Sequence, residues 1–580
     1  MGTPTTNPVG GIRVKPRGLN RLRTLLLVVA VITGGDISTA STKPVESRYG
    51  MVVAAEPLAT AIGLQVLRDG GSAVDAAVAT AFALAVTYPQ AGNIGGGGFI
   101  VFRPTVGASV AYDFREMAPA ASSPSMFSID GVYDSTRHHN SHIAVGVPGT
   151  VSGLYLAWSD HGRLSWQRLL DPAIDLARNG FIVSHDLAGS LAAVLPRMAQ
   201  YDASVQQFSN GGEPYQAGER FRQEELASTL ERIGIQGPSG FYSGRTAQLI
   251  EAEMRANGGL ITRRDLANYR SHRTTPIRTT YRGHEIISMP PISSGGTALV
   301  QMLNILEGYG LAEFGFGSTR TVHVMVEAMR RAFADRARYL GDPKFNPTMP
   351  ISLLSSKSYA ERLRATIQLD RASSSSPVSF EWPIEGAETT HLSVVDSDRQ
   401  AVSLTYTLEQ LYGSKIVVPG AGFLLNNEMG DFNPGPGMTD AEGRIGTEPN
   451  LARPGKRMLS SMTPTIVEKG GNLFMVTGSP GGRTIINTVL QTIVNVIDFG
   501  MNIQEAVDAP RFHHQWLPDR ISYERHGLSP DTIALLESQG HHLQVVDSQG
   551  AAQVIRYDVT ADVLEGAPDR RRVGSTALGY

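Results

Sequence analysis

The stretch AETTHLSVVD, residues 387–396, places a glutamate, two threonines and a histidine at the head of an alternating, strand-like pattern. Two interpretations are open. In the first, the threonines are ordinary strand residues, because threonine is common in β-strands, and His391 is a solvated edge residue. In the second, the chain is cut before Thr389, and this threonine becomes an N-terminal nucleophile. The rest of the sequence must decide between them.

The composition is that of a large globular protein. Of the 580 residues, 41% are hydrophobic and 18% are charged. The formal net charge of −3 gives no indication of a nucleic-acid partner. The chain contains no cysteine, which excludes disulfides, thiol catalysis and cysteine-ligated zinc.

The first 40 residues have the order of a secretory signal. A basic stretch ends at Arg23, an apolar run covers residues 25–32, and small residues follow at Ser38 and Ala40. The apolar run is shorter than the roughly 20 residues that a membrane-spanning helix needs. We therefore expect residues 1–40 to be a cleaved signal peptide, leaving a periplasmic or secreted protein without a stable membrane span.

The hydrophobic period changes along the chain. Apolar residues recur at helical spacing over residues 59–67 and 74–86, and Ser72 is placed to cap the second helix. Residues 150–370 look mainly helical, whereas from residue 389 a period of two predicts strands, followed by helices at 485–499 and 504–509. Between the two halves, the Ser- and Pro-rich residues 371–388 are typical of an exposed loop or linker.

Several familiar motifs are incomplete. GGGGF at 95–99 lacks the following lysine of a phosphate loop and the spacing of a dinucleotide site, and HEIIS at 284–288 lacks the second histidine of a zinc-protease helix. No G-x-S-x-G motif occurs. The histidine pairs at 138–139, 513–514 and 541–542 have no partner ligands at metal spacing, so we interpret them as structural.

Four segments after Thr389 supply polar groups and glycines that fit one mechanism. They are LTYTLEQ at 404–410 with Thr407, LLNNEMGDF at 424–432 with Glu428 and Asp431, MLSSMTPT at 458–465 with Ser460 and Ser461, and TGSPGGRT at 477–484 with Gly481 and Gly482. Together with GMVVAAEPLATAIG, GNIGGGGF, FREMAP, YLGDP and APRFHHQWLPD, they make the sequence resemble the gamma-glutamyltransferases, or glutathione hydrolases, of the N-terminal nucleophile hydrolase superfamily. The resemblance covers essentially the whole chain after residue 40.

This resemblance implies an α+β fold, a four-layer αββα sandwich. It also implies a precursor that cuts itself between Glu388 and Thr389 into a large subunit, residues 41–388, and a small subunit, residues 389–580. The two subunits would form a heterodimer and build one domain. No cofactor and no metal ion are expected. The substrates would be glutathione and other γ-glutamyl compounds, with water, an amino acid or a dipeptide as the acceptor.

The resemblance also assigns roles to residues. Thr389 would be the nucleophile, Thr407 would orient it, and the backbone N–H groups of Gly481 and Gly482 would form an oxyanion hole. After the cut, the α-amine of Thr389 can act as the base, because its ordinary pKa of about 7.7–8.0 is near working pH. The substrate α-carboxylate would be held by Arg115, Ser460 and Ser461. The substrate α-ammonium would be held by Glu409, Glu428 and Asp431.

Two positions depart from the family pattern. Glu409 stands where many members have asparagine, so three carboxylates would crowd one site and raise at least one carboxyl pKa. Residues 434–455 should form a Gly- and Pro-rich lid over the site. Glu442 lies about where some members have a tyrosine gate, which leaves the choice between hydrolysis and transpeptidation open.

Two other functions are kept as alternatives. One is a related acylase of the same superfamily, acting on a β-lactam side chain or on poly-γ-glutamate. The other is a non-catalytic surface binding protein on this fold. The retained Thr389, Thr407 and Gly481-Gly482 argue against the second alternative.

Overall fold

The computed structural model describes residues 42–376, 388–438, 440–442 and 444–580. Of these, residues 43–580 form one compact unit. The expected signal peptide and residues 377–387 of the linker lie outside the described residues. In the described part of the chain, no helix is long and apolar enough to cross a membrane.

The first sheet is antiparallel and carries the strand that begins with Glu388 and Thr389. Its seven strands lie in the order β11-β4-β3-β15-β14-β2-β23. Their bounds are β11 His272–Thr274, β4 Val110–Phe114, β3 Gly97–Arg103, β15 Ala401–Glu409, β14 Glu388–Val395, β2 Met51–Ala54 and β23 Thr576–Gly579. Strand β14 contains both Glu388 and Thr389, so the expected cleavage point lies inside this strand.

The second sheet is also antiparallel and has seven strands in the order β1-β22-β21-β17-β16-β13-β12. Their bounds are β1 Val45–Ser47, β22 Val563–Pro568, β21 Gln553–Asp558, β17 Asn472–Thr477, β16 Thr465–Lys469, β13 His284–Ser288 and β12 Ile277–Tyr281. Each sheet therefore combines strands from before and after Thr389.

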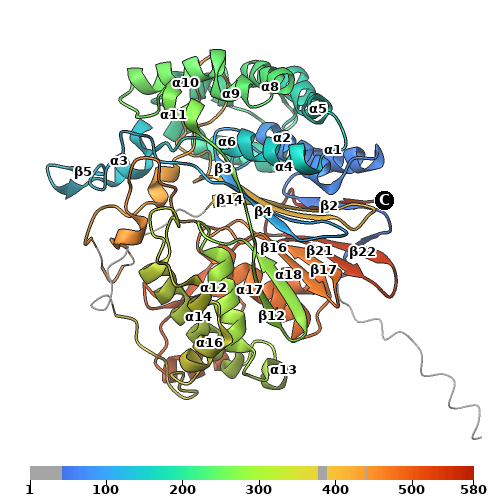
Figure 1. Cartoon of the computed structure of the whole chain (residues 1–580), viewed down its shortest axis with the longest axis vertical. Helices are drawn as coiled ribbons and strands as arrows, with labels where there is room; N and C mark the ends of the chain where they lie inside the picture. Colours follow the sequence, from blue (N-terminus) through green and yellow to red (C-terminus); the bar gives the residue numbers. More distant parts are fainter. Residues whose placement is uncertain (1–41, 377–387, 439, 443) are drawn as a thin grey trace, which may run out of the picture. The chain divides into compact units, whose positions relative to one another are not determined.

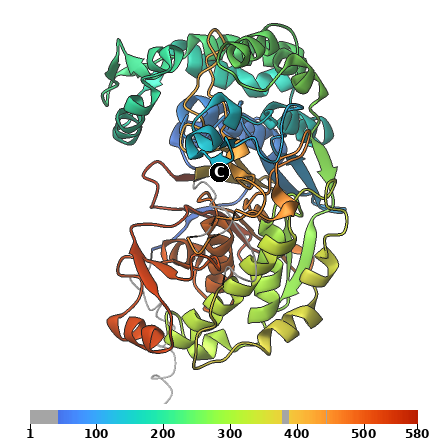
Figure 2. The same ribbon diagram turned by 90° about the vertical axis from the view of Figure 1, so that its left-hand side faces the viewer.

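Helices cover the outer face of each sheet (Figures 1 and 2). Above the first sheet lie α1 Pro57–Arg68, α2 Ala73–Thr87, α4 Thr150–His161, α5 Trp166–Asn179, α6 His185–Met198 and α8 Glu224–Gln236. Below the second lie α12 Gly295–Leu306, α14 Thr319–Tyr339, α16 Lys357–Arg364, α17 Thr484–Ile497 and α18 Ile503–Asp508. The expected four-layer αββα sandwich is confirmed.

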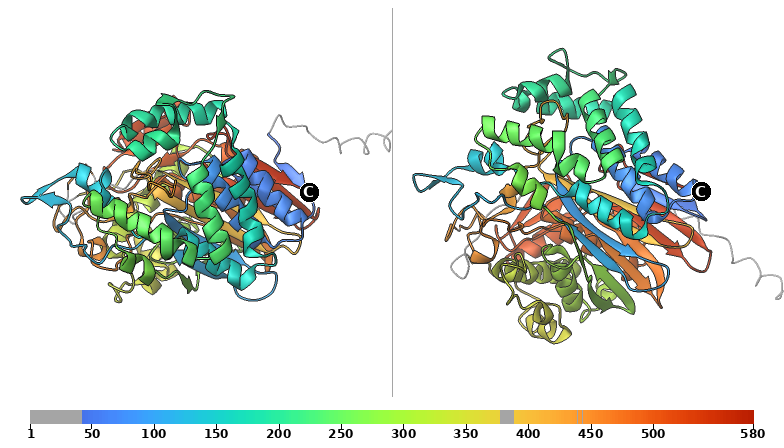
Figure 3. Two further views of the ribbon diagram at one scale, coloured as in Figure 1. Left: turned by 90° about the horizontal axis from the view of Figure 1, so that it is seen from above. Right: turned by 45° about the horizontal axis from the view of Figure 1, so that its top comes forward.

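Shorter elements extend the upper helical layer and the edges of the sandwich. The upper layer continues with α7 Asp202–Phe208, α9 Ser239–Tyr242, α10 Gly244–Ala256 and α11 Arg263–Asn268. Near the C-terminus, β18 Phe512–His513, β19 Ile521–Glu524 and β20 Leu543–Val546 form a small sheet beside α19 Pro530–Ser538. The hairpin β5 Ser128–Ile129 and β6 Val132–Tyr133 projects from the sheets and leads into α3 Ser135–His139 (Figure 3).

Alternating side chains on each strand explain the layers. On β2, Val52 and Ala54 pack into the helix-side core, whereas Met51 and Val53 join the core between the two sheets. A strand presents successive side chains to opposite faces, so each apolar strand supplies two cores. On β14, Leu392 and Val394 face the helices. Thr389, on the opposite parity, therefore faces the second sheet.

The predicted helices are confirmed, but one predicted helical region contains strands. Ser72 caps α2 through a reciprocal capping box with Asp75, as expected. Within residues 150–370, however, residues 277–288 form the hairpin β12–β13. Its two-residue turn, Arg282-Gly283, has positive φ at both positions, which is the geometry that joins adjacent antiparallel strands tightly.

Candidate active site

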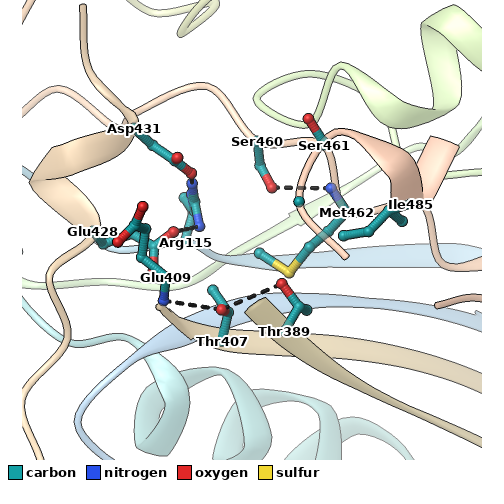
Figure 4. Close-up of a pocket in the computed structure, with 11 residues that line it drawn as sticks. Arg115, Thr389, Thr407, Glu409, Glu428, Asp431, Ser460, Ser461, Met462 and Ile485 are labelled. Carbon is teal, nitrogen blue, oxygen red and sulfur yellow. Dashed lines mark hydrogen bonds and ion pairs between the residues drawn. The ribbon is translucent and has the colours of Figure 1, made fainter. Parts of the chain in front are cut away.

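The structure places Thr389 near the start of β14, in a pocket between the two sheets. Its side chain is buried, with 5% of its surface exposed. The Thr389 hydroxyl donates a hydrogen bond to Thr407 Oγ1 at 3.3 Å, and Thr407 Oγ1 also accepts from the Glu409 backbone N–H at 2.9 Å. Thr407 therefore links the candidate nucleophile to the turn that carries Glu409 (Figure 4).

The glycine run at 95–98 allows strand β15, which carries Thr407, to pack closely against it. A Cβ atom on Gly96 would lie 1.9 Å from the backbone oxygen of Thr407, and one on Gly98 would lie 2.4 Å from that of Thr405. Asn93 Nδ2 donates to the same Thr407 oxygen at 2.9 Å. This glycine run, which does not have the sequence of a phosphate loop, thus lets its backbone lie close to the backbone of residues 405–407 beside the site.

Arg115 follows β4 and is fully buried. Its guanidinium is ion-paired with Glu428 and Asp431, and it donates to the backbone oxygens of Met458 at 3.3 Å and Leu459 at 3.2 Å. Burial alone would lower the Arg115 pKa, but the neighbouring carboxylates raise it, so the charge is kept. The residue expected to clamp the substrate carboxylate is thus paired with two of the three residues expected to hold the ammonium, Glu428 and Asp431.

Two glutamates of the site are buried in the neighbourhood of Arg115 and Asp431. Burial, followed by the charge of Asp431, raises the pKa of Glu409 well above its ordinary value. Burial also raises the pKa of Glu428 well above its ordinary value, against the opposing effect of Arg115. The expectation that crowding raises at least one carboxyl pKa agrees with these directions. The cluster as a whole favours retaining a proton while no cation is bound.

The paired serines lie on the other side of the pocket, in a segment that approaches the second sheet. Ser460 Oγ accepts from the Met462 backbone N–H at 3.1 Å, and Ser461 Oγ accepts from Arg336 at 3.1 Å. The Ser294 backbone N–H donates to the Ser460 oxygen at 2.7 Å and holds the segment against residues 292–295. Figure 4 shows both serines across the pocket from Glu409 and Glu428.

Gly481 and Gly482 precede α17 and have φ values of +128° and +55°. Side chains rarely adopt this left-handed region, so glycine suits both positions. Gly482 lines the pocket together with Ile485, at the N-terminal end of the helix. An N-terminal end with exposed N–H groups favours negative charge.

All ten expected site residues except Gly481 line this one pocket, with Met462 and Ile485 completing it. Sequence reasoning missed three neighbours. Glu116, whose pKa burial raises to about 8, lies 3.6 Å from Arg115, and Asn427 donates to Glu409. His139 Nδ1 lies 3.9 Å from Glu409 Oε1, so this histidine belongs to the wall of the site. In the sequence, His139 was noticeable only because it adjoins His138.

Four of the other five histidines in the three pairs have side-chain contacts within the protein, whereas His542 is exposed. His138 contacts Tyr133 and the Met429 backbone oxygen, His513 contacts Asn487, and His541 contacts His323. In the described residues, no group of three His, Cys, Asp or Glu side chains could hold a metal ion. The side chains that line the pocket bring hydroxyl, carboxylate and guanidinium groups together.

Comparison with known families matches the sequence model described as gamma-glutamyltranspeptidase to residues 59–579. The chain belongs to this family. The glutathione hydrolase proenzyme of Escherichia coli (strain K12) is 44% identical over an alignment that covers 98% of this chain and 100% of that protein. The chain is thus an enzyme of the gamma-glutamyltranspeptidase type.

Two solved structures are similar to this gamma-glutamyltranspeptidase family member. Cephalosporin acylase from Bacillus halodurans has a TM-score of 0.82 and 29% identity, covering 93% of this chain and 98% of that one. Gamma-glutamyltranspeptidase from Helicobacter pylori has a TM-score of 0.55 and 43% identity, covering 58% of this chain and 95% of that one. Both support the N-terminal nucleophile hydrolase fold.

Proposed function

We propose that the protein is an exported gamma-glutamyltransferase and glutathione hydrolase that matures by cutting its own chain between Glu388 and Thr389. The observation that carries this proposal is the meeting of Thr389 and Thr407 with Arg115, the acidic cluster and the serine pair in one pocket. A hydroxyl nucleophile lies beside groups suited to both charges of an α-amino acid head. The name of the Escherichia coli relative supports the same activity and a proenzyme.

In the mature enzyme, the new α-amine of Thr389 takes the proton of its own hydroxyl as Oγ1 attacks the γ-glutamyl carbonyl. The N–H groups of Gly481 and Gly482 stabilise the oxyanion, and one such donor is typically worth about 2.7–4 kcal/mol. The amine then passes the proton to the leaving nitrogen, which leaves a γ-glutamyl ester on Thr389. Water or an acceptor amine resolves the ester and frees the hydroxyl.

Donor binding must reorganise the pairing of Arg115. The donor α-carboxylate replaces one acidic side chain at the guanidinium, while its α-ammonium offers that side chain a new partner. The ion pairs of the empty site are thereby exchanged for ion pairs with the donor. Ser460 and Ser461 supply hydroxyls for the same carboxylate across the pocket.

A second candidate is an acylase that acts on a β-lactam side chain or poly-γ-glutamate. The similarity to cephalosporin acylase favours keeping it. Its substrates need not carry an α-ammonium next to the reacting chain. The buried acidic cluster beside Arg115 supports the γ-glutamyl donor instead, because Glu409 Oε1 has no hydrogen-bond partner among the described residues and a buried carboxylate favours a cationic partner.

The test compares the wild type with Thr389→Ala on a denaturing gel and with a γ-glutamyl anilide, with and without a dipeptide acceptor. We expect two chains and anilide cleavage for the wild type, and one inactive chain for Thr389→Ala. An uncut, inactive wild type would contradict the proposal. Two chains that cleave a glutaryl-cephalosporin but no γ-glutamyl anilide would establish the acylase instead. The acceptor comparison separates hydrolysis from transpeptidation.

A further inference from the structure

Beside the pocket, a carboxylate oxygen of Glu409 and a ring nitrogen of His139 face each other at a distance too long for a hydrogen bond. Glu409 Oε1 and His139 Nδ1 are both buried, lie 3.9 Å apart, and have no hydrogen-bond partner among the described residues. The other carboxylate oxygen, Oε2, accepts from Asn427 Nδ2. Glu409 is 3% exposed and lines the pocket, so its carboxyl group adjoins the space that a ligand would occupy.

Glu409 is held in this position by its backbone. Its φ of +81° is unusual for a residue with a side chain, and its N–H is fixed by Thr407 Oγ1 at 2.9 Å. Asn427 also donates to the backbone oxygen of His139 at 3.0 Å, so one amide side chain fixes both members of the pair. The gap between Glu409 and His139 is thus built into the local structure.

The charges around Glu409 disfavour two ionised partners. The titratable groups that act on it or face it are Asp431, Lys415, Arg115, Glu428, His139 and Tyr133. Burial, and then Lys415, lowers the pKa of His139 to about 4, so the imidazole stays neutral near neutral pH. A neutral imidazole leaves the Glu409 charge uncompensated on that side, which costs free energy in a buried site.

We propose that Glu409 holds a proton in the empty site, facing His139, and releases it to solvent when the α-ammonium group of a donor binds. Binding then exchanges one positive charge for another: the O–H bond of the Glu409 carboxyl breaks, its proton passes to solvent, and no other covalent bond changes. His139 is a positioning residue that acts through Glu409. This inference rests on the proposed function and adds a proton exchange at the acidic subsite, in which a ligand without a cationic amine cannot replace the proton.

The pH dependence has a definite sign. Glu409 has a raised pKa in the empty site, and a bound ammonium lowers it. Between these two pKa values, binding releases a proton, so affinity for the amine rises with pH by up to about tenfold per unit. The α-amine of Thr389 has the opposite effect for an anionic ligand, because a bound carboxylate favours its charged form. The contribution of Glu409 is therefore obtained by subtracting the pH dependence of ligand binding in a Glu409 variant from that in the wild type.

The experiment uses the mature enzyme and two inhibitors, L-glutamate and glutarate, which differ by the α-amine. Calorimetric titrations in buffers of different ionisation enthalpy count the protons released per ligand bound. We expect the wild type to release about one more proton per L-glutamate than Glu409→Gln, and Glu409→Asp to retain the release. For glutarate, the wild type and Glu409→Gln should give the same count.

His139→Gln tests the positioning role. It should shift the pH at which L-glutamate binding strengthens, because the surroundings of the Glu409 carboxyl change, while leaving glutarate binding unchanged. A purely structural role would weaken both ligands alike. Glu253→Gln is the matched control, because Glu253 Oε1 lies 2.8 Å from His142 Nε2 outside the pocket lining. It should give the wild-type proton count.

Equal proton counts for L-glutamate in the wild type and Glu409→Gln would overturn this inference while leaving the proposed function intact. Failure of the wild type both to cleave a γ-glutamyl anilide and to bind L-glutamate would overturn the proposed function and this inference together. A glutarate affinity equal to that for L-glutamate, at every pH, would contradict the exchange of the proton for a cationic amine.

Discussion

At the scale of single residues, one hydroxyl oxygen joins the nucleophile to the donor subsite. Thr407 Oγ1 accepts from the hydroxyl of Thr389 and from the backbone N–H of Glu409. Orientation of the attacking hydroxyl and placement of the acidic subsite therefore depend on the same atom. Removing it affects both the self-cleavage and the turnover that we propose.

Thr407→Val keeps the shape of the side chain and removes this oxygen. A net hydrogen bond is worth about 0.5–1.5 kcal/mol, so we expect self-cleavage and turnover each to slow by up to about tenfold. Rates of chain cutting and of anilide hydrolysis measure the effect, and Thr407→Ser should stay close to the wild type.

Thr390→Val is the matched control. Thr390 adjoins Thr389, but its hydroxyl is buried without a hydrogen-bond partner among the described residues. Thr390 also lies on the face of β14 that is turned towards the helices, as Leu392 and Val394 do. Valine should therefore be neutral or slightly stabilising at 390. If Thr407→Val behaved like Thr390→Val in both assays, the orienting role would be refuted.

At the scale of elements, helix α14 anchors the first, described part of the linker, residues 371–376. Glu327 accepts from the Ser373 backbone N–H at 3.0 Å and from the Ser373 hydroxyl at 2.5 Å. Asp519 accepts from the Ser375 backbone N–H at 2.7 Å. Because Asp519 lies after the proposed cut, this contact would join the end of the proposed large subunit to the small one.

The anchor should weaken in acid. Burial raises the pKa of Glu327, but the charges of Arg330 and Arg331 and the hydrogen bond from Ser373 outweigh burial. The net result is a pKa of about 2. A depressed carboxyl pKa gives stability that is complete above its ordinary value and is lost as pH falls towards the depressed value. Hydrogen exchange at the Ser373 amide should therefore lose its protection between about pH 4.5 and about pH 2.

Glu327→Gln gives the comparison. The glutamine side chain does not titrate in this pH range. In this variant, the protection factor of the Ser373 backbone N–H should therefore be low and independent of pH, once intrinsic exchange rates are corrected for. Equal, pH-independent protection in the wild type and Glu327→Gln would exclude the ionised carboxylate as the anchor.

The sequence predicted the periodic elements better than it predicted their partners. Helices 59–67, 74–86, 485–499 and 504–509 are present because an apolar face or an apolar run is a local signal. The hairpin β12–β13 was missed, since its turn is Arg-Gly and its surroundings are helical. His139 was missed for another reason: its role depends on Glu409, which is 270 positions away. Spatial pairing of this kind leaves no local pattern.

The pocket itself was predictable only through the resemblance. Thr389, Arg115 and Ser460 are each ordinary residues in their local sequence, and nothing in spacing alone brings them together. What the sequence did not indicate is that Arg115 is already paired with Glu428 and Asp431 in the empty site. That pairing follows from burial of one cation among several anions.

At the scale of the whole compact unit, the proposed subunits interleave. In the first sheet, β15 and β14 lie between β3 and β2, and in the second, β16 pairs with β13. Strands from after the cut are thus hydrogen-bonded on both sides to strands from before it. Separating the chains would require breaking both sheets and their shared core.

We therefore expect the cut protein to behave as one particle. Size-exclusion chromatography in native buffer should give a single peak that contains both chains, and denaturant should separate them only as the protein unfolds. The uncut Thr389→Ala chain is the reference for the elution volume. Elution of the two chains as separate, folded species in native buffer would contradict the interleaved arrangement as the state of the mature enzyme.

The central claim is that Thr389, freed at its amino end, carries the γ-glutamyl group. The most direct measurement is intact-mass and peptide analysis of enzyme quenched in acid during turnover of a γ-glutamyl anilide. The account predicts a small chain that begins at Thr389, part of which bears one γ-glutamyl group on that residue. An active enzyme whose chain is uncut, or whose γ-glutamyl group is attached to any residue other than Thr389, would contradict it.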